Sequence, residues 1–353
     1  MMFKRNEVCY KKEMKHLWII IGIIIMGSVT LATSNHSLIG QHMIIGISHY
    51  PIQKEWLTFI KENKISGIIF ISDTYKQADK IKRSIETIKQ VTTHTLFFCI
   101  DQEGGQVSRI KDNIIQVPAA SKIAALYSEQ EAFITYQKQA RELANLGINV
   151  NFSPVLDIIN NKNNTVIGSR SFGSTPKIVF KFGKEVINAS LMENIIPVMK
   201  HFPGHGYTTH DSHKQMPIHT NKDHLFNVDI IPFKKGIQIG APAIMVSHVL
   251  YPELDANNPA SLSEVIITTY LKKTLKFNGI VFSDDLTMGA ITNQYKLAVA
   301  FKKSIKAGVH QAIIITPLNS LKSFMKDIEK ELNQDKSLIK IMKHNKQIIN
   351  RFK

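Results

Sequence analysis

The stretch A-I-M-V-S-H at Ala243–His248 is followed, after the segment Ser263–Lys276, by a second short run, G-I-V-F-S-D, at Gly279–Asp284. Both runs are continuously apolar until their last residues, whereas the segment between them spaces its apolar residues as a helix does. Continuous rather than alternating hydrophobicity in short strands is typical of a parallel sheet that helices cover. This stretch therefore predicts a strand, a covering helix and a second strand parallel to the first.

The same unit recurs along the chain. Helix-compatible segments such as Thr74–Val91, Ser128–Leu146 and Thr175–Asn194 separate further apolar runs, and the Lys-rich tail from Leu318 to Lys353 predicts one or two closing helices. Eight strand and helix units predict an α/β protein whose residues 40–353 form one (β/α)8 TIM-type barrel, as a single domain. The predicted strands are Met43–Ser48, Gly67–Ser72, Leu96–Asp101, Asn149–Ile158, Pro197–His201, Ala243–His248, Gly279–Asp284 and Gln311–Thr316.

An open, doubly wound sheet is the competing architecture. It would usually carry a glycine-rich phosphate turn directly after its first strand. The first run is instead followed by His49-Tyr50-Pro51, and no P-loop occurs in the sequence. We therefore expect a barrel, and we predict that the protein works without a cofactor.

Residues 1–33 differ from the rest of the chain. Met1–His16 contains five Lys or Arg against two Glu, and Leu17–Thr33 then runs without a charge. A basic segment before an uncharged apolar one predicts a signal peptide or membrane anchor, which places the barrel in the cell envelope. Membrane contact through residues 17–33 is expected if no cleavage follows residue 32. A buried first helix in a cytoplasmic protein is the alternative.

The formal charge of +16 raises the question of nucleic acid as a partner. The lysines are scattered along the chain, and no recognition motif accompanies them, so we expect no nucleic acid partner. We expect a monomer. Of the two cysteines, Cys9 precedes the hydrophobic segment and Cys99 lies inside an apolar run, which predicts no disulfide and a core position for Cys99.

Polar residues end most of the predicted strands. Because the active site of such a barrel lies at the carboxyl ends of its strands, these side chains are expected to converge on one rim. A single carboxylate at such a point is often only a helix cap, but several together predict a site. The residues in question are Asp101, Asp157, Lys200, His201, His248, Asp284 and Asp285.

The most specific motif is K-H-F-P-G-H-G-Y-T-T-H-D-S-H at residues 200–213, whose glycines and proline predict a shaped loop. With it, the chain resembles the β-N-acetylhexosaminidase branch of glycoside hydrolase family 3. The matching motifs follow the family's order and span residues 101–290. They are DQEGG, NFSPVLDI, IGSRSFG, KHFPGHG with DSH, and FSDDLTMGA.

The resemblance implies a retaining enzyme that removes terminal non-reducing β-linked N-acetylglucosamine through a covalent glycosyl-aspartate. The expected substrate is a small glycan or muropeptide, that is, a peptidoglycan fragment or a related glycan. It implies that Asp284, rather than Asp285, is the nucleophile. It also implies that His213 is the general acid and base, with Asp211 as its partner. The residues implied to bind the sugar are Asp101, Arg170, Lys200 and His201, with Arg109 as a further candidate.

The chemistry of these residue types agrees with the implied roles. A retaining glycosidase needs a carboxylate to attack the anomeric carbon and a second group to protonate the leaving oxygen. Here the second group would be His213 in place of the usual carboxylate, and a histidine can both give and accept a proton near neutral pH. Asp211, two residues earlier, could orient the ring.

Three rival functions follow from the same residues. Six of the fourteen histidines lie between His201 and His224, which could indicate a metal-dependent hydrolase. We predict no metal site, because the first strand ends without a His-x-His pair and the histidines lie on a glycine loop. We expect His219 and His224 to be solvated loop residues. A phosphorylase of related mechanism and a sugar-binding module without activity are the other two.

Overall fold

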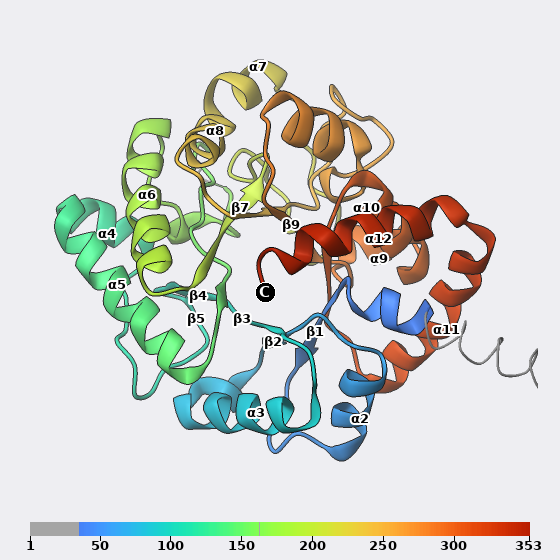
Figure 1. Ribbon diagram of the computed structural model, residues 1–353. Helices are drawn as coiled ribbons and strands as arrows, with labels where there is room; N and C mark the ends of the chain where they lie inside the picture. The colour runs from blue at the N-terminus through green and yellow to red at the C-terminus, as the bar shows by residue number, and fades with distance from the viewer. Residues whose placement is uncertain (1–34, 162) are drawn as a thin grey trace, which may run out of the picture.

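The computed structural model describes residues 35–161 and 163–353. Eight parallel strands close into a barrel in the order β1, β2, β3, β6, β7, β8, β9, β10, and β10 pairs with β1 (Figure 1). The predicted barrel is therefore confirmed. The strands are β1 Met43–Ile47, β2 Gly67–Phe70, β3 Phe97–Ile100, β6 Val150–Asn151, β7 Ile196–Phe202, β8 Ala243–Val246, β9 Ile280–Asp285 and β10 Gln311–Ile314.

Helices surround the barrel on its outside (Figure 1). Their starts follow local sequence signals: Ser128 caps α5 in a capping box with Glu131, and Thr175 caps α6, whose first residue is Pro176. Two closing helices, α11 and α12, form from the Lys-rich tail. The longer helices are α2 Lys54–Glu62, α3 Ala78–Val91, α5 Glu129–Leu146, α6 Pro176–Met192, α8 Ile231–Gln238, α10 Leu297–Ala307, α11 Leu318–Gln334 and α12 Lys336–Asn350, and the short ones include α4 Ala120–Leu126, α7 Lys222–His224 and α9 Gly289–Thr292.

Some predicted elements differ in detail from the structure. The strand predicted at Asn149–Ile158 is regular only over β6, because Pro154 has no N–H for the ladder, although the Leu156 N–H still donates to the Lys200 carbonyl at 2.6 Å. The helix predicted at Ser263–Lys276 is a π-helix, η5 Val265–Thr274. The DQEGG motif folds into a small hairpin that the sequence did not indicate, with β4 Gln102–Gly104 and β5 Val107–Ser108.

The inside of the barrel is filled by apolar side chains that come from all eight strands. Phe282 lies at its centre, with ring centroids 6.2 Å from Phe97 and 5.5 Å from Phe152. Cys99 is fully buried in the same cluster, as its sequence context predicts. At the amino-terminal end, Phe352 packs against this cluster, and Figure 1 shows the C-terminus over the barrel's centre. One end is therefore closed, and the carboxyl end is left for a site.

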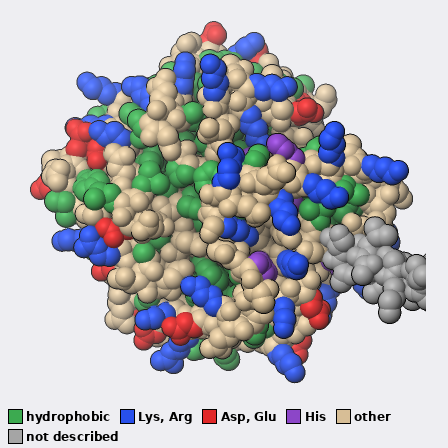
Figure 2. Space-filling view, in the orientation of Figure 1, with side chains coloured by type: hydrophobic (Ala, Val, Ile, Leu, Met, Phe, Trp, Pro, Cys, Tyr) green, Lys and Arg blue, Asp and Glu red, His purple; other side chains and the backbone are tan. Residues whose placement is uncertain are grey.

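The segment predicted as a signal peptide or anchor, residues 1–33, lies outside the described residues. Among the helices that the structure does describe, none is long and apolar enough to span a bilayer. The Lys and Arg side chains are spread around the face seen in Figure 2 and do not gather into a stripe.

We expect Phe282→Ala to lower the free energy of unfolding by about 3–5 kcal/mol, because it empties the middle of the barrel. Val265→Ala, at a position whose side chain is 45% exposed, serves as the control and should change stability by no more than about 0.5 kcal/mol. Urea denaturation of the two variants measures the difference. Equal losses would mean that the aromatic cluster does not support the barrel.

Candidate active site

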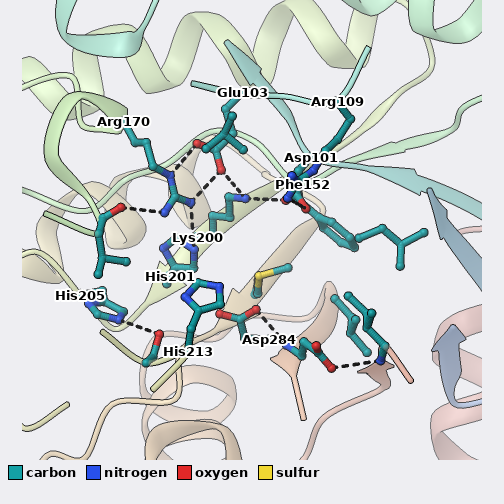
Figure 3. Close-up of a pocket in the computed structure, with 18 residues that line it drawn as sticks. Asp101, Glu103, Arg109, Phe152, Arg170, Lys200, His201, His205, His213 and Asp284 are labelled. Atoms are coloured by element: carbon teal, nitrogen blue, oxygen red, sulfur yellow. Dashed lines mark hydrogen bonds and ion pairs between the residues drawn. The ribbon is translucent and has the colours of Figure 1, made fainter. Parts of the chain in front are cut away.

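A pocket of about 160 Å³ opens at the carboxyl ends of the strands, where the sequence places its polar strand ends. Figure 3 shows its labelled side chains pointing inward: Glu103 comes from β4, Lys200 and His201 from β7, Asp284 from β9, and the others from the segments between the strands. Apolar side chains such as Phe152 and Met245 form part of its lining. The polar lining residues are Asp101, Glu103, Arg109, Arg170, Lys200, His201, His205, Ser212, His213, Asp284 and Asp285.

Lys200 is the buried cation at the centre of one wall. Its ammonium group contacts Asp101 Oδ1 at 2.8 Å and also pairs with Glu103. Its side chain is only 3% exposed, so these two carboxylates replace the water that the ammonium has lost. Lys200 and Asp101, both predicted, thus lie in direct contact.

Arg170 is the second buried cation of this wall. Its Nε and Nη2 donate to the two oxygens of Glu103 at 2.9 and 2.8 Å, a bidentate pair (Figure 3). Arg109 is less firmly held, since it lies 3.6 Å from Asp101 and its side chain is 42% exposed. Arg170 is therefore fixed in place, whereas Arg109 stands at the pocket's edge.

The charge balance of this cluster controls its protonation. Burial alone would raise the pKa of Glu103, but the charges of Lys200 and Arg170 outweigh it and lower that pKa from 4.5 to about 2. Burial would likewise lower the pKa of Lys200, yet Asp101 and Glu103 hold it above its ordinary value. Glu103, Lys200 and Arg170 are therefore ionised at neutral pH.

Asp157 holds the start of the long loop after β7. It is completely buried and accepts hydrogen bonds from the backbone N–H of His201 and, at 2.7 Å, that of His205. It also lies 2.6 Å from His201 Nδ1. Because Nδ1 faces the carboxylate, the His201 ring is oriented with Nε2 on the side of Arg170, 3.5 Å from Nη2.

Asp284 lines the pocket at the end of β9. Burial would raise the pKa of its carboxyl group, but His248, His201, the Asp285 N–H and Lys200 together keep it below its ordinary value. The neighbouring Asp285 is different, because burial raises its pKa to about 6 and its oxygens accept from Thr287 and from the Ile315 N–H. Of these two aspartates, Asp284 is therefore the one whose carboxylate is ionised and accepts no hydrogen bond from a described side chain.

His248 is buried behind these two aspartates. Its Nδ1 lies 2.7 Å from Ser261 Oγ, and its Nε2 lies 2.9 Å from the carbonyl oxygen of Asp285. Burial lowers the pKa of this imidazole. His248 therefore supports the end of β9 from behind, a position that the sequence alone did not explain.

The loop that carries Asp211 and His213 reaches back to the pocket. His213 Nδ1 lies 2.8 Å from Asp211 Oδ1, and the same oxygen accepts the His213 N–H at 2.9 Å. The His213 side chain is 66% exposed, so it lies at the pocket mouth. The N–H groups of Gly289 and Ala290 in α9 donate to this loop and hold it over the strand that ends in Asp284.

The base of the loop is clamped by side chains that we expected to be solvated. His219 is 2% exposed and lies 2.9 Å from the buried Asp229, and His224 lies 3.6 Å from the same carboxylate. The Tyr207 ring lies between the two imidazoles, with centroids 4.7 and 4.8 Å away. The prediction of a solvated loop residue was therefore wrong for His219, because a buried carboxylate later in the chain draws it inward, whereas the His224 side chain stays 20% exposed.

His205 is not placed as a proton donor. Burial lowers its pKa to about 4, and its two ring nitrogens face Thr208 Oγ1 and Ser212 Oγ. Over residues 35–161 and 163–353, no group of three or more His, Cys, Asp or Glu side chains is arranged to hold a metal ion.

A family model, the glycosyl hydrolase family 3 N terminal domain, matches residues 36–350. The chain belongs to glycosyl hydrolase family 3. A beta-hexosaminidase of Actinobacillus pleuropneumoniae (serotype 5b, strain L20) is 32% identical over 273 residues, which make up 75% of this chain and 78% of that protein. A beta-hexosaminidase of Xylella fastidiosa (strain 9a5c) is 27% identical over 282 residues, 78% of this chain and 83% of that one.

A solved structure of the same family agrees with this assignment. A glycoside hydrolase family 3 beta-N-acetylglucosaminidase from Paenibacillus sp. str. FPU-7 superposes with a TM-score of 0.81 at 28% identity. The match covers 90% of this chain but 62% of the Paenibacillus chain, so this protein spans about three fifths of that enzyme's length.

The family 3 pocket brings together every residue to which the sequence analysis gave a catalytic or sugar-binding role except Asp211, which touches it through His213. Asp157 and His248, which also end predicted strands, lie behind the lining. Four residues in or behind the pocket wall were not assigned a role from the sequence: Glu103, Asp157, His205 and His248. Glu103 stands two residues after Asp101 in the DQEGG motif. The sequence analysis placed two cations, Lys200 and Arg170, beside a single carboxylate, Asp101, and this imbalance could have indicated that Glu103 is their second partner.

We expect Glu103→Gln to lower the free energy of unfolding at neutral pH by about 3–5 kcal/mol, because it leaves Lys200 and Arg170 without a shared carboxylate. The pKa of Glu103 is depressed, so its contribution is complete above pH 4.5 and is lost as the pH falls toward 2. The difference between variant and parent should therefore shrink over that range. Denaturant titrations at several pH values measure it, with the exposed Glu264→Gln as control; a constant gap would contradict the assignment.

Proposed function

We propose that the protein is a retaining β-N-acetylhexosaminidase that removes terminal, non-reducing β-linked N-acetylglucosamine. The observation that carries the proposal is the ionised Asp284 carboxylate in a narrow pocket whose opposite wall holds buried charged groups. The names of the relatives at 27–32% identity support a beta-hexosaminidase. The pocket's small volume favours removal of one terminal sugar at a time.

Asp284 is the proposed nucleophile. A retaining mechanism requires a carboxylate that is ionised, rigid and free to approach the anomeric carbon. The lowered pKa of Asp284 and its place at the end of β9 meet these needs, whereas Asp285 has a raised pKa and is bonded to Thr287. The glycosyl ester would therefore form on Asp284.

The buried cluster is proposed to bind the sugar. Lys200, Arg170 and Asp101 face the pocket as charged groups; Lys200 is paired with Asp101, and Arg170 is paired with Glu103. Charged hydrogen bonds to sugar hydroxyls are among the stronger polar contacts. His201, oriented by Asp157, adds a ring nitrogen on the same wall. Arg109 would contact the sugar from the edge, where it is half-exposed.

His213 is the proposed general acid and base. Its Nδ1 faces Asp211, so its Nε2 is left for the leaving oxygen and later for water. Because the ring lies at the mouth of the pocket, it is on the side from which the leaving group departs. Asp211 orients the ring and stabilises its charged form.

Peptidoglycan fragments are the proposed natural substrates, and the cell envelope is the proposed location, since residues 1–33 have the composition of a signal or anchor. An assay that compares an N-acetylglucosaminyl-anhydromuramyl peptide with N,N′-diacetylchitobiose tests the substrate. Faster release of N-acetylglucosamine from the peptide-bearing sugar is the expected result, and the opposite order would indicate a chitin-type substrate.

We expect Asp284→Asn to lose turnover by about 10⁴-fold or more while it still binds the sugar, because the amide keeps the shape but cannot attack. A fluorinated N-acetylglucosaminide that is released slowly should label residue 284 of the parent protein, as mass spectrometry of peptides can show. Asp223→Asn, an exposed carboxylate on α7, serves as the control. A label on Asp285 or Asp157 would overturn the assignment.

We expect His213→Ala to slow natural substrates by about 10² to 10⁴, the range for loss of a general acid. An aryl glycoside with an acidic phenol needs little protonation, so its first step should be nearly normal and the glycosyl-enzyme should accumulate. Azide, which needs no deprotonation, should restore turnover and give the glycosyl azide. Asp211→Asn should show a milder form of the same pattern.

One combination of results would contradict the role of His213 as general acid and base. If both classes of substrate slow equally and azide has no effect, then His213 binds the sugar or supports the loop instead of transferring a proton.

A further inference from the structure

A second cavity of about 500 Å³ lies beside the pocket, and we call it the outer cavity. It is formed by residues 46–56, at the end of β1 and beyond it, and by residues 315–322, which follow β10. Both segments lie at the carboxyl end of the barrel, so the outer cavity opens on the same face as the pocket. Ile315 lines both spaces.

The partition between the two spaces is thin. Gly46 lies in it, and a Cβ at this position would approach Ile315 to 3.0 Å and Ile71 to 3.1 Å. The two isoleucine side chains therefore lie against the bare backbone of β1. Because Ile315 lines both spaces, the pocket and the outer cavity are direct neighbours.

The outer cavity is lined by neutral side chains that can donate and accept hydrogen bonds. Ser48, Gln53, Thr316 and Asn319 are of this kind, and their side chains make no hydrogen bond with another described residue. His49 also lines the cavity, and its Nε2 is buried without a partner among the described residues. A buried ring nitrogen without a partner costs free energy unless a ligand satisfies it.

The charges of the outer cavity nearly cancel. Glu55 and Lys322 are its ionised residues, one of each sign, and no ion pair joins them. The pocket, in contrast, is dominated by buried charged groups. A neutral lining with several hydroxyl and amide groups matches the hydroxyl and acetamido groups of an uncharged sugar better than it matches a phosphate or another ion.

We propose that the outer cavity binds the sugar residue on the leaving side of the bond that is cut. The inference rests on the proposed function. The pocket holds one terminal residue, so the next residue of a glycan must lie directly outside it, on the face where the outer cavity opens. Binding energy gained there helps to hold the glycosidic bond over Asp284, and it is lost with a substrate that has no second sugar.

The test fills the cavity without touching the pocket. Gln53→Trp and Asn319→Trp each place a large ring in the outer cavity from an exposed position, and Gln53 makes no side-chain capping bond that would be lost. Lys326→Trp, exposed on the same helix as Asn319 but outside the cavity, is the matched control. The substrates are N,N′-diacetylchitobiose and methyl β-N-acetylglucosaminide.

The expected result is a change in substrate preference. The two cavity variants should lose about tenfold or more in kcat/KM for the disaccharide, the size of effect that one lost subsite contact produces, and should keep the parent value for the methyl glycoside. The Lys326 variant should match the parent on both. An equal disaccharide to methyl glycoside ratio in all proteins would overturn the outer cavity as a subsite while leaving the proposed function intact. Absence of activity on either substrate in the parent would instead refute the proposed function.

Discussion

Lys200 and Arg170 carry two positive charges into the mouth of the barrel, where they have lost most of their water. Such burial is tolerated only when carboxylates contact the cations with good geometry. Glu103 contacts both, and through it β7, the hairpin after β3 and the segment that ends in Arg170 are joined. Because these groups are ordered by each other, the charged wall is in place before a sugar arrives and needs no reorganisation during the reaction. The position of the pocket depends on this cluster.

The strand ends were predictable because a parallel barrel brings them to one rim whatever the rest of the sequence does. Asp101, Lys200, His201 and Asp284 therefore lie where their places at the ends of apolar runs put them. Asp157 also ends a predicted strand, but its purpose depends on accepting the N–H groups of the loop after β7, and backbone geometry of that kind leaves no trace in the order of the residues. The sequence therefore predicts which polar side chains lie together at the rim, but it does not predict which of them position the others through hydrogen bonds.

The loop with His213 shows where prediction from sequence stops. Its glycines indicate a shaped loop, but its path is set by distant residues: α9 holds its far end, and Asp229 draws His219 and His224 against Tyr207 at its base. Both histidines were expected in solvent, whereas the carboxylate that buries His219 and also contacts His224 comes from a later segment. Gly206 adds a further constraint, since a side chain there would collide with the carbonyl of Ile158. The position of the loop therefore depends on tertiary contacts with distant segments, and its own sequence does not determine it.

The barrel is closed by the pairing of β1 with β10, which begins at Met43 and Ala312. These two residues stand far apart in the sequence. Contacts between such distant residues slow folding, because the chain must be ordered over its whole length before they form. During synthesis the ribosome releases β1 long before its partner, and until then β1 exposes an unpaired edge that can associate with other chains.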